Sequence, residues 1–288
     1  MGGSLGAMST APLSEFYNLM AVGNVVAWAS VDGGPPFRLR PGSEKDRATP
    51  GTAMLWRYMP KDRFFDLLDR RALFFTRLTR YHDSDPFEGA LQYGVAKIHE
   101  QIVREKGGDV QEFLRERERF VKKFLKVVLV NCWHEREYES RPMWDRYGRG
   151  GEAVAVVTTF DALKQSVPEH VDVGHMDYID AGSDEIRNHS ANPSHRAFQK
   201  RREFEDEREV RCVIFDYPEH GPKPDEEIPI AAGTDTGYHV PVDLSRLVAG
   251  AVVSPDSPQI IGEVRQKLVE SGIEVEIVPS TLLTPPTY

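Results

Sequence analysis

The stretch Phe204-Glu-Asp-Glu-Arg-Glu-Val-Arg211 runs directly into the apolar, β-branched segment Cys212-Val-Ile-Phe215. A segment dense in acids and arginines thus leads into a predicted buried strand. Charged side chains are rarely buried unless they are paired. The carboxylates and the arginine at the start of this strand therefore need ionic partners or a ligand.

Glu207, Glu209 and Arg211 alternate along this stretch, and side chains two residues apart share one face of an extended chain. If Glu207 and Glu209 face the same pocket, we expect their repulsion to raise the pKa of at least one carboxylate. Such a pair suits catalysis. The alternative is a solvated helix end with its own salt bridges.

The composition restricts the classes of function. The chain has 288 residues, with 36 Lys and Arg against 45 Asp and Glu, for a net charge of -9. This excess of acidic residues argues against nonspecific electrostatic binding of nucleic acid over the whole surface. Binding in a local basic groove remains an alternative. No apolar run reaches the length of a membrane span. Because Cys132 and Cys212 lie far apart in apolar runs, we expect buried thiols in a cytoplasmic protein.

Gly- and Pro-rich stretches and the patterns of apolar residues indicate how the chain is divided into segments. Residues 1–50 are rich in Gly, Pro, Ser and Ala and predict a flexible N-terminal region. From residue 51 to 288, strand and helix patterns alternate, which predicts a single mixed α/β domain. A charged, proline-poor stretch at about 90–126 predicts a helical insertion in two parts. The helix expected between Pro258 and Ser271 lies between two strands and predicts a parallel strand–helix–strand unit.

Two further positions allow both a functional and a structural interpretation. Arg57 lies inside an otherwise apolar strand, where it either pairs with a carboxylate or binds an anion beside a pocket. Trp144 and Tyr147 are neighbours on one helix face ahead of a glycine-rich loop. They suit a stacking and phosphate-holding site, or they are ordinary core anchors.

The order of these motifs resembles the bacterial domain-of-unknown-function family DUF2971 over roughly residues 53 to 282. The matching elements are Arg57-Tyr58 on a first strand, the loop Asp85-Pro-Phe-Glu88, the strand residues Cys132-Trp133, the helix Met143-Trp-Asp-Arg-Tyr-Gly148, the strand 150–160, the aromatic-x-x-Glu-x-Glu-x-Arg element 204–211 and the terminal strand 248–255.

That family in turn resembles ADP-ribosyltransferases, so the resemblance implies an α+β fold with an ADP-ribosyltransferase-like split β-sheet core. It implies NAD as substrate and no metal. Arg57 would hold NAD, Glu209 would be the catalytic glutamate, and Glu207 would orient the acceptor. The other residues placed at the cofactor are Tyr58, Trp133, Trp144, Tyr147, Glu88 and Arg211, the last with a role in holding Glu88 or Glu209.

We therefore expect an NAD-dependent ADP-ribosyltransferase that modifies RNA, DNA or protein, as a toxin or phage-defence effector with an antitoxin as a candidate partner. The oxocarbenium-like state formed when the nicotinamide bond breaks would be stabilised by a carboxylate. Alternatives stay open: an NAD glycohydrolase, a nucleotide-binding module, or a non-enzymatic interaction protein. A metal-dependent nuclease is another, through the carboxylates of Asp85, Glu88, Glu207 and Glu209.

Overall fold

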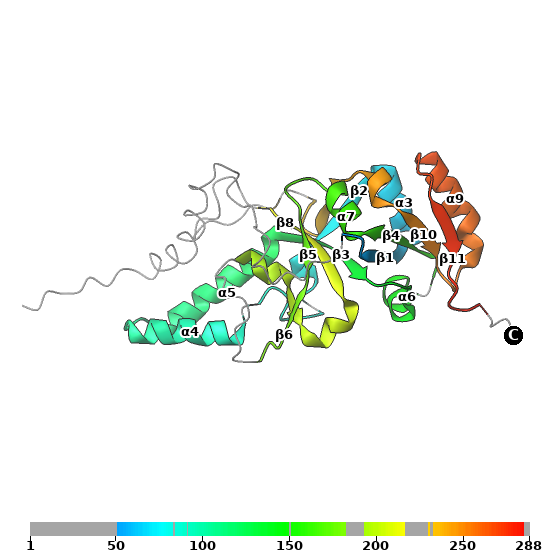
Figure 1. Ribbon diagram of the computed structural model, residues 1–288. Helices are drawn as coiled ribbons and strands as arrows, with labels where there is room; N and C mark the ends of the chain where they lie inside the picture. The colour runs from blue at the N-terminus through cyan, green and yellow to red at the C-terminus, as the bar shows by residue number, and fades with distance from the viewer. Residues whose placement is uncertain are drawn as a thin grey trace, which may run out of the picture.

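The computed structural model describes residues 51–284, except 83, 91, 150, 183–192, 217–229 and 231–232. The predicted flexible region 1–50 lies outside the described residues. The described chain has a mixed α+β fold around one large sheet (Figure 1), which confirms the predicted fold class at this level.

The sheet has nine strands in the described part of the chain, and a second, parallel pair of strands lies beside it. The large sheet contains β1 (Met54–Pro60), β2 (Ala72–Arg77), β3 (Val128–Glu135), β4 (Ala153–Thr159), β5 (Asp172–His175), β8 (Glu209–Phe215), β9 (Gly237–Pro241), β10 (Gly250–Val253) and β11 (Glu276–Pro279). The pair is β6 (Asp177–Ile179) and β7 (Gln199–Arg201).

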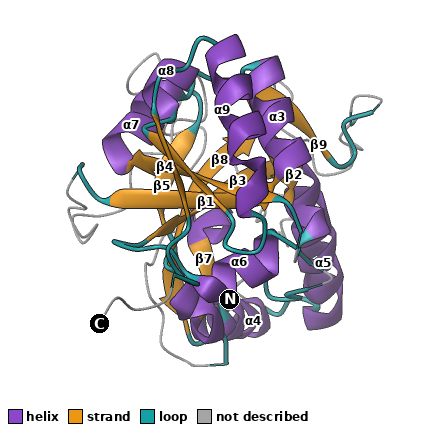
Figure 2. Ribbon diagram, turned by 90° about the vertical axis from the view of Figure 1, so that its right-hand side faces the viewer, coloured by secondary structure: helices purple, strands orange, loops and turns teal. Residues whose placement is uncertain are grey.

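Helices cover both faces of the sheet. The α-helices are α3 (Lys61–Arg70), α4 (Tyr93–Glu105), α5 (Val110–Val127), α6 (Arg141–Tyr147), α7 (Phe160–Ser166), α8 (Leu244–Leu247) and α9 (Ile261–Glu270), and the short 3-10 helices are η2 (Leu78–Arg80), η3 (Pro193–Phe198), η4 (Arg202–Glu207) and η5 (Pro258–Ile260). Figure 2 shows α3, α7, α8 and α9 on the upper side of the strands and α6 on the lower side.

Each face has its own apolar core. On the first, Leu67 of α3, Leu163 of α7 and Leu268 of α9 pack with Leu129 and Val210 of the sheet. On the second, α5 packs against β2 and β3, while Met143 and Trp144 of α6 pack on β1 and β4. We call these the α3 face and the α6 face. Alternation along β3 and β8 puts Trp133 on the α3 face, and Glu209 and Arg211 on the α6 face.

The sheet forks at β3. One edge of β3 pairs with β8 over its length, from Val128↔Phe215 to His134↔Glu209. The other edge is shared: β1 pairs at Trp56↔His134, and β2 pairs at Thr76↔Val130. Residues 131–133 have no strand partner on this shared edge within the described chain. The backbone groups exposed in the fork therefore need side-chain partners.

Asn131 and Arg57 fill the fork. The Asn131 amide donates to the Phe74 carbonyl of β2 at 3.0 Å. Its oxygen accepts from the indole N–H of Trp133 at 2.9 Å and from Arg57 Nη1 at 3.0 Å. Arg57 Nη1 also donates to the Cys132 carbonyl at 2.6 Å. These bonds join β1, β2 and β3 where backbone pairing is missing.

The local predictions mostly agree with the observed elements. The predicted strand–helix–strand unit at the C-terminus is present, and β10 and β11 pair in parallel. Two helices, α4 and α5, occupy the predicted charged stretch and extend together at the end of the sheet opposite α9 and β11 (Figure 1). His134 still lies within β3, and β5 and β6 are two separate short strands.

We predict that Asn131→Leu lowers the free energy of unfolding by about 3 kcal/mol, because it leaves the Phe74 carbonyl and the Trp133 N–H buried without their partner. Urea denaturation measures the change. Gln101→Leu removes an amide from an exposed helix position and should change stability by less than about 0.5 kcal/mol. An equal effect of both substitutions would show that Asn131 does not hold the fork.

Asp172 of β5 gives a second prediction, because burial raises the pKa of its carboxyl to about 7. The folded-state pKa lies above the unfolded value, so the free energy of unfolding falls as pH rises from about 4 to 7. Asp172→Asn removes this dependence. We expect it to raise Tm by about 5 °C more at pH 7.5 than at pH 4.5, a value that allows for the partial exposure of the carboxyl. The exposed Asp206→Asn is the control, and a pH-independent Tm difference in Asp172→Asn contradicts the assignment.

Candidate functional site

The acidic stretch 204–211 places its charged side chains on the α6 face of the sheet. The strand itself begins only at Glu209, and Glu207 ends the 3-10 helix η4. Arg208 between them has a left-handed backbone, with φ of 43°, which turns the chain sharply into β8. The predicted alternation thus holds for Glu209 and Arg211, whereas Glu207 reaches the same place from a turn.

Lys200 of β7 brings the two carboxylates together. Its amine pairs with Glu207 Oε2 at 2.8 Å and with Glu209 Oε2 at 2.9 Å. The second oxygen of Glu209 accepts from Arg211 Nε at 2.8 Å. The second oxygen of Glu207 pairs with Arg146 of α6, whose side chain is 45 % exposed. Both carboxylates are therefore engaged at both oxygens, and Arg146 forms the exposed end of the network.

Arg211 extends the network inward. Its guanidinium is completely buried and pairs through Nη1 with Glu88 Oε1 at 2.6 Å and with the Ala197 carbonyl at 2.7 Å. Its Nη2 has no hydrogen-bond partner among the described residues. Glu88 comes from the predicted loop after η2, and Asp85 of the same loop pairs with Arg201 at 2.9 Å. Buried charges of both signs are thus held in fixed geometry.

The pKa of Glu209 differs from the value that repulsion between the two carboxylates predicts. Burial alone would raise the pKa of Glu209, but Arg211 and Lys200 outweigh burial and hold this pKa below its ordinary value. Burial likewise disfavours the charged form of Lys200, yet Glu209 and Glu207 raise the pKa of the amine. The expectation of a raised pKa is therefore wrong for Glu209. The reason is that two cations, Arg211 first and Lys200 second, lie against its carboxylate.

Aromatic side chains border the carboxylates on the α6 side. The ring of Tyr147 lies 5.1 Å from that of His134, whose Nδ1 lies 2.9 Å from the Glu207 carbonyl. Burial and the nearby Glu207 raise the pKa of the Tyr147 hydroxyl. The Tyr178 hydroxyl accepts a hydrogen bond from the backbone N–H of Glu209 at 2.8 Å. Phenol and imidazole groups thus adjoin the ion pairs.

Tyr58 and Trp144 connect α6 to β1. Their rings meet edge to face with the centroids 4.8 Å apart, and both side chains are buried where α6 packs on β1. The Tyr58 hydroxyl accepts from the backbone N–H of Ser140, and the Trp144 indole donates to Glu139. These contacts anchor α6 to β1 and so position Arg146 and Tyr147 on the same helix.

Arg57 lies apart from the catalytic candidates. It leaves β1 on the same side as Leu55 and Met59, which belong to the core of the α3 face, whereas Glu209 leaves β8 on the α6 face. Its guanidinium occupies the fork and lies 5.9 Å from the ring of the buried Trp133. The structure thus brings Glu88, Glu207, Glu209, Arg211 and Tyr147 together, whereas the side chains of Arg57 and Trp133 make their hydrogen bonds in the fork.

Four members of the network are missing from the sequence-based site, namely Lys200, Arg146, His134 and Tyr178. Lys200 opens a basic run ahead of the acidic stretch, and the need of buried carboxylates for partners is a signal that points to it. His134 and Tyr178 carry no local signal, because their place depends on the pairing of β3 with β8 and on the turn before β8.

No group of three His, Cys, Asp or Glu side chains within the described ranges is arranged to hold a metal ion. The carboxylates of the nuclease alternative each pair with a cation: Asp85 with Arg201, Glu88 with Arg211, and the two others with Lys200. In the same part of the chain, none of the helices is both long enough and apolar enough to cross a bilayer.

Comparison with known proteins adds no relative to this picture: no family model, no curated protein and no solved structure matches the chain. The resemblance to DUF2971 and to ADP-ribosyltransferases therefore stays a prediction that rests on the quoted motifs.

We predict that Glu209→Gln destabilises the fold, because it leaves two buried cations with one carboxylate fewer. The free energy of unfolding at pH 7 should fall by about 3 kcal/mol. Since the folded pKa of Glu209 is lowered, this contribution is present above the unfolded pKa of about 4.3 and is lost as pH falls below it.

Urea denaturation of wild type and Glu209→Gln at several pH values tests this linkage, and the difference between the two stabilities should begin to shrink near pH 4 and shrink further as pH falls toward the lowered folded-state pKa. Glu205→Gln, an exposed position in the same stretch, is the matched control and should behave as wild type. A difference between wild type and Glu209→Gln that persists unchanged to low pH would contradict the ionic role of Glu209.

Proposed function

We propose that the protein binds NAD on the α6 face, cleaves the bond between nicotinamide and ribose, and transfers ADP-ribose to a macromolecular acceptor. The observation that carries the proposal is the ionised Glu209 carboxylate, 2 % exposed and fixed from two sides by Lys200 and Arg211. A fixed negative charge in a dry site stabilises developing positive charge without reorganisation. Departure of nicotinamide creates such a charge on the ribose.

The exposed edge of the network suggests how the substrate approaches. Arg146 is half-exposed and reaches the site from α6, and a guanidinium matches phosphate oxygens in a two-point geometry. We propose Arg146 as the pyrophosphate ligand, in place of Arg57, whose guanidinium is engaged in the fork. When Arg146 turns to phosphate, Glu207 loses one of its two cations and becomes available.

Glu207 then serves as general base. The nicotinamide–ribose bond breaks with its electron pair on the departing nicotinamide, and an acceptor oxygen or nitrogen forms the new bond to the ribose carbon. The acceptor proton moves to Glu207. Tyr147, whose ring adjoins His134 beside Glu207, borders the space that the ribose would occupy. Glu209 stays in place and acts through its charge.

The architecture supports the proposal by analogy. A split sheet is what the resemblance to ADP-ribosyltransferases implies, and the sheet forks at β3 beside the site. An NAD glycohydrolase would use the same residues with water as acceptor, and an effector role with an antitoxin depends on the identity of that acceptor.

Nicotinamide release from NAD by the purified protein tests the proposal, with and without RNA, DNA or a cell lysate. We expect release that withstands EDTA and falls about 100-fold in Glu207→Gln, because the general base is lost. Glu205→Gln should retain full activity. Circular dichroism at the assay temperature verifies that each variant is folded.

Three outcomes would overturn the proposal. They are equal release by wild type and a folded Glu207→Gln, release that requires a divalent metal, and no release together with no thermal shift on adding NAD. Labelled NAD then separates transfer from hydrolysis, since only transfer leaves label on a macromolecule.

A further inference from the structure

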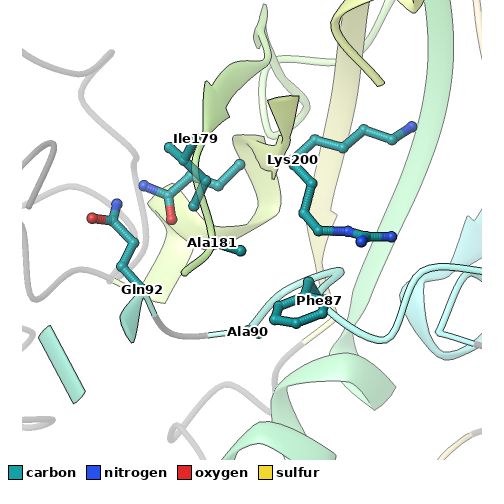
Figure 3. A pocket seen from close by; sticks show the side chains of 8 residues that line it. Phe87, Ala90, Gln92, Ile179, Ala181 and Lys200 are labelled. Carbon is teal, nitrogen blue, oxygen red and sulfur yellow. The ribbon is translucent and has the colours of Figure 1, made fainter. Parts of the chain in front are cut away.

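The pocket beside Lys200 has room for about one water molecule, with a volume of about 10 Å³. Phe87, Gln92 and Ile179 are among its lining residues, and the Lys200 amine extends away from them (Figure 3). A partner larger than water therefore requires an exposed surface. The outer edge of β11 is such a surface, because β11 is the last strand in the order of the large sheet and pairs only with β10 within the described chain.

The outer edge of β11 presents backbone groups for hydrogen bonding. The Ser280 N–H donates to the Val253 carbonyl at 2.9 Å, so Ser280 turns its groups inward to β10. The groups of successive residues in a strand alternate between its two edges. Val275, Ile277 and Pro279 therefore point theirs outward. Pro279 has no N–H, so a ladder on this edge ends there with an acceptor only.

Apolar side chains border this edge. Val275 and Ile277 pack partly on the core of the α3 face. Glu276 and Val278 alternate with them and so leave β11 on the other face, where both are exposed. An edge with free backbone groups and apolar neighbours suits the addition of a further strand. Four of the nine exposed large apolar side chains in the described chain lie within residues 269–283, and they are Val269, Val278, Leu282 and Leu283.

A second copy of β11 complements this edge when the two strands run antiparallel about Ile277. The Ile277 N–H of each copy then donates to the Ile277 carbonyl of the other, and the Val275 N–H donates to the Pro279 carbonyl. These cross-strand pairs are apolar on the α3 face. On the other face, Glu276 lies opposite Val278 of the other copy, so no like charges meet.

The neighbouring registers are less favourable. Alignment about Glu276 would place the Glu276 carboxylates of the two copies directly opposite each other. Alignment about Val278 would require the Thr281 N–H for pairing with Val275, and this N–H already donates to Glu139 at 2.9 Å. The same bond fixes the end of β11, so pairing requires little further ordering of the chain. The edge thus favours the register about Ile277.

We propose that two copies of the chain associate through β11, antiparallel about a two-fold axis at Ile277, so that their large sheets join into one continuous sheet. A two-fold interface uses the same edge of both copies and closes after one pairing. This association is independent of the proposed function, because β10, β4, β1 and β3 lie between β11 and the strand that carries Glu209.

Sedimentation velocity of the full-length protein between about 1 and 100 μM measures the association. We expect wild type to approach twice the mass of one chain as the concentration rises. Val278→Asp places a carboxylate opposite Glu276 of the other copy and should raise the Kd of the dimer about tenfold. The double variant, Glu276→Lys with Val278→Asp, puts opposite charges at these positions and should return the Kd to the wild-type range.

Ile98→Asp is the matched control, since it adds the same charge at an exposed apolar position of α4 and should leave the Kd unchanged. Circular dichroism verifies that each variant is folded. Hydrogen exchange locates the interface, because the Val275 and Ile277 amides should exchange more slowly at the higher concentration. Four outcomes would each overturn the proposal: a monomeric wild type, equal association of wild type and Val278→Asp, no recovery in the double variant, and exchange at these amides that does not change with concentration.

Discussion

The site depends on the burial of one charge, the guanidinium of Arg211. Its side chain is fully buried, and an unpaired cation there would be prohibitively unfavourable. Its partners come from three segments: Glu209 from its own strand, Glu88 from the loop after η2, and the Ala197 carbonyl from η3. Compensation of this one charge therefore ties distant parts of the chain to the start of β8, and the site is assembled as a consequence.

The charges of the network balance. Arg146, Lys200 and Arg211 face Glu88, Glu207 and Glu209, and each cation pairs with at least one carboxylate. A network with equal numbers of cations and carboxylates is stable without a ligand, and each of its carboxylates has a cationic partner. An anionic ligand that attracts Arg146 breaks the balance at its exposed end, so that Glu207 keeps only Lys200 as a cationic partner while Glu209 stays fixed. Binding and activation of the base would thus be one event.

Local sequence patterns predicted the elements better than their assembly. Period-two alternation within β1 is a local property, and it correctly groups Arg57 with Leu55 and Met59. Which face of the sheet then carries Glu209 depends on the pairing of β3 with both β1 and β8, and no local pattern contains that information. The motif resemblance joined Arg57 and Glu209 in one site, whereas the register of the strands places them on opposite faces.

Lys200 shows a second limit of sequence reasoning. A raised pKa was a sound inference from the two carboxylates alone. The pKa of Glu209 is lowered instead, because Arg211 and then Lys200, which comes from a three-residue strand, lie against the carboxylate. A strand so short has no periodicity to recognise. The sequence did, however, require a cation somewhere near these acids, and the basic run that precedes them supplies it.

The exposed fraction of the side chains increases along the network from Glu209 to Arg146. The side chains of Glu209, Glu207 and Arg146 are 2 %, 5 % and 45 % exposed. Solvent and ligands therefore meet Arg146 first, and the innermost carboxylate is the most strongly held. Lys200, 10 % exposed, pairs with both carboxylates, so a ligand that displaces its amine would deprive Glu207 and Glu209 of the cation that they share.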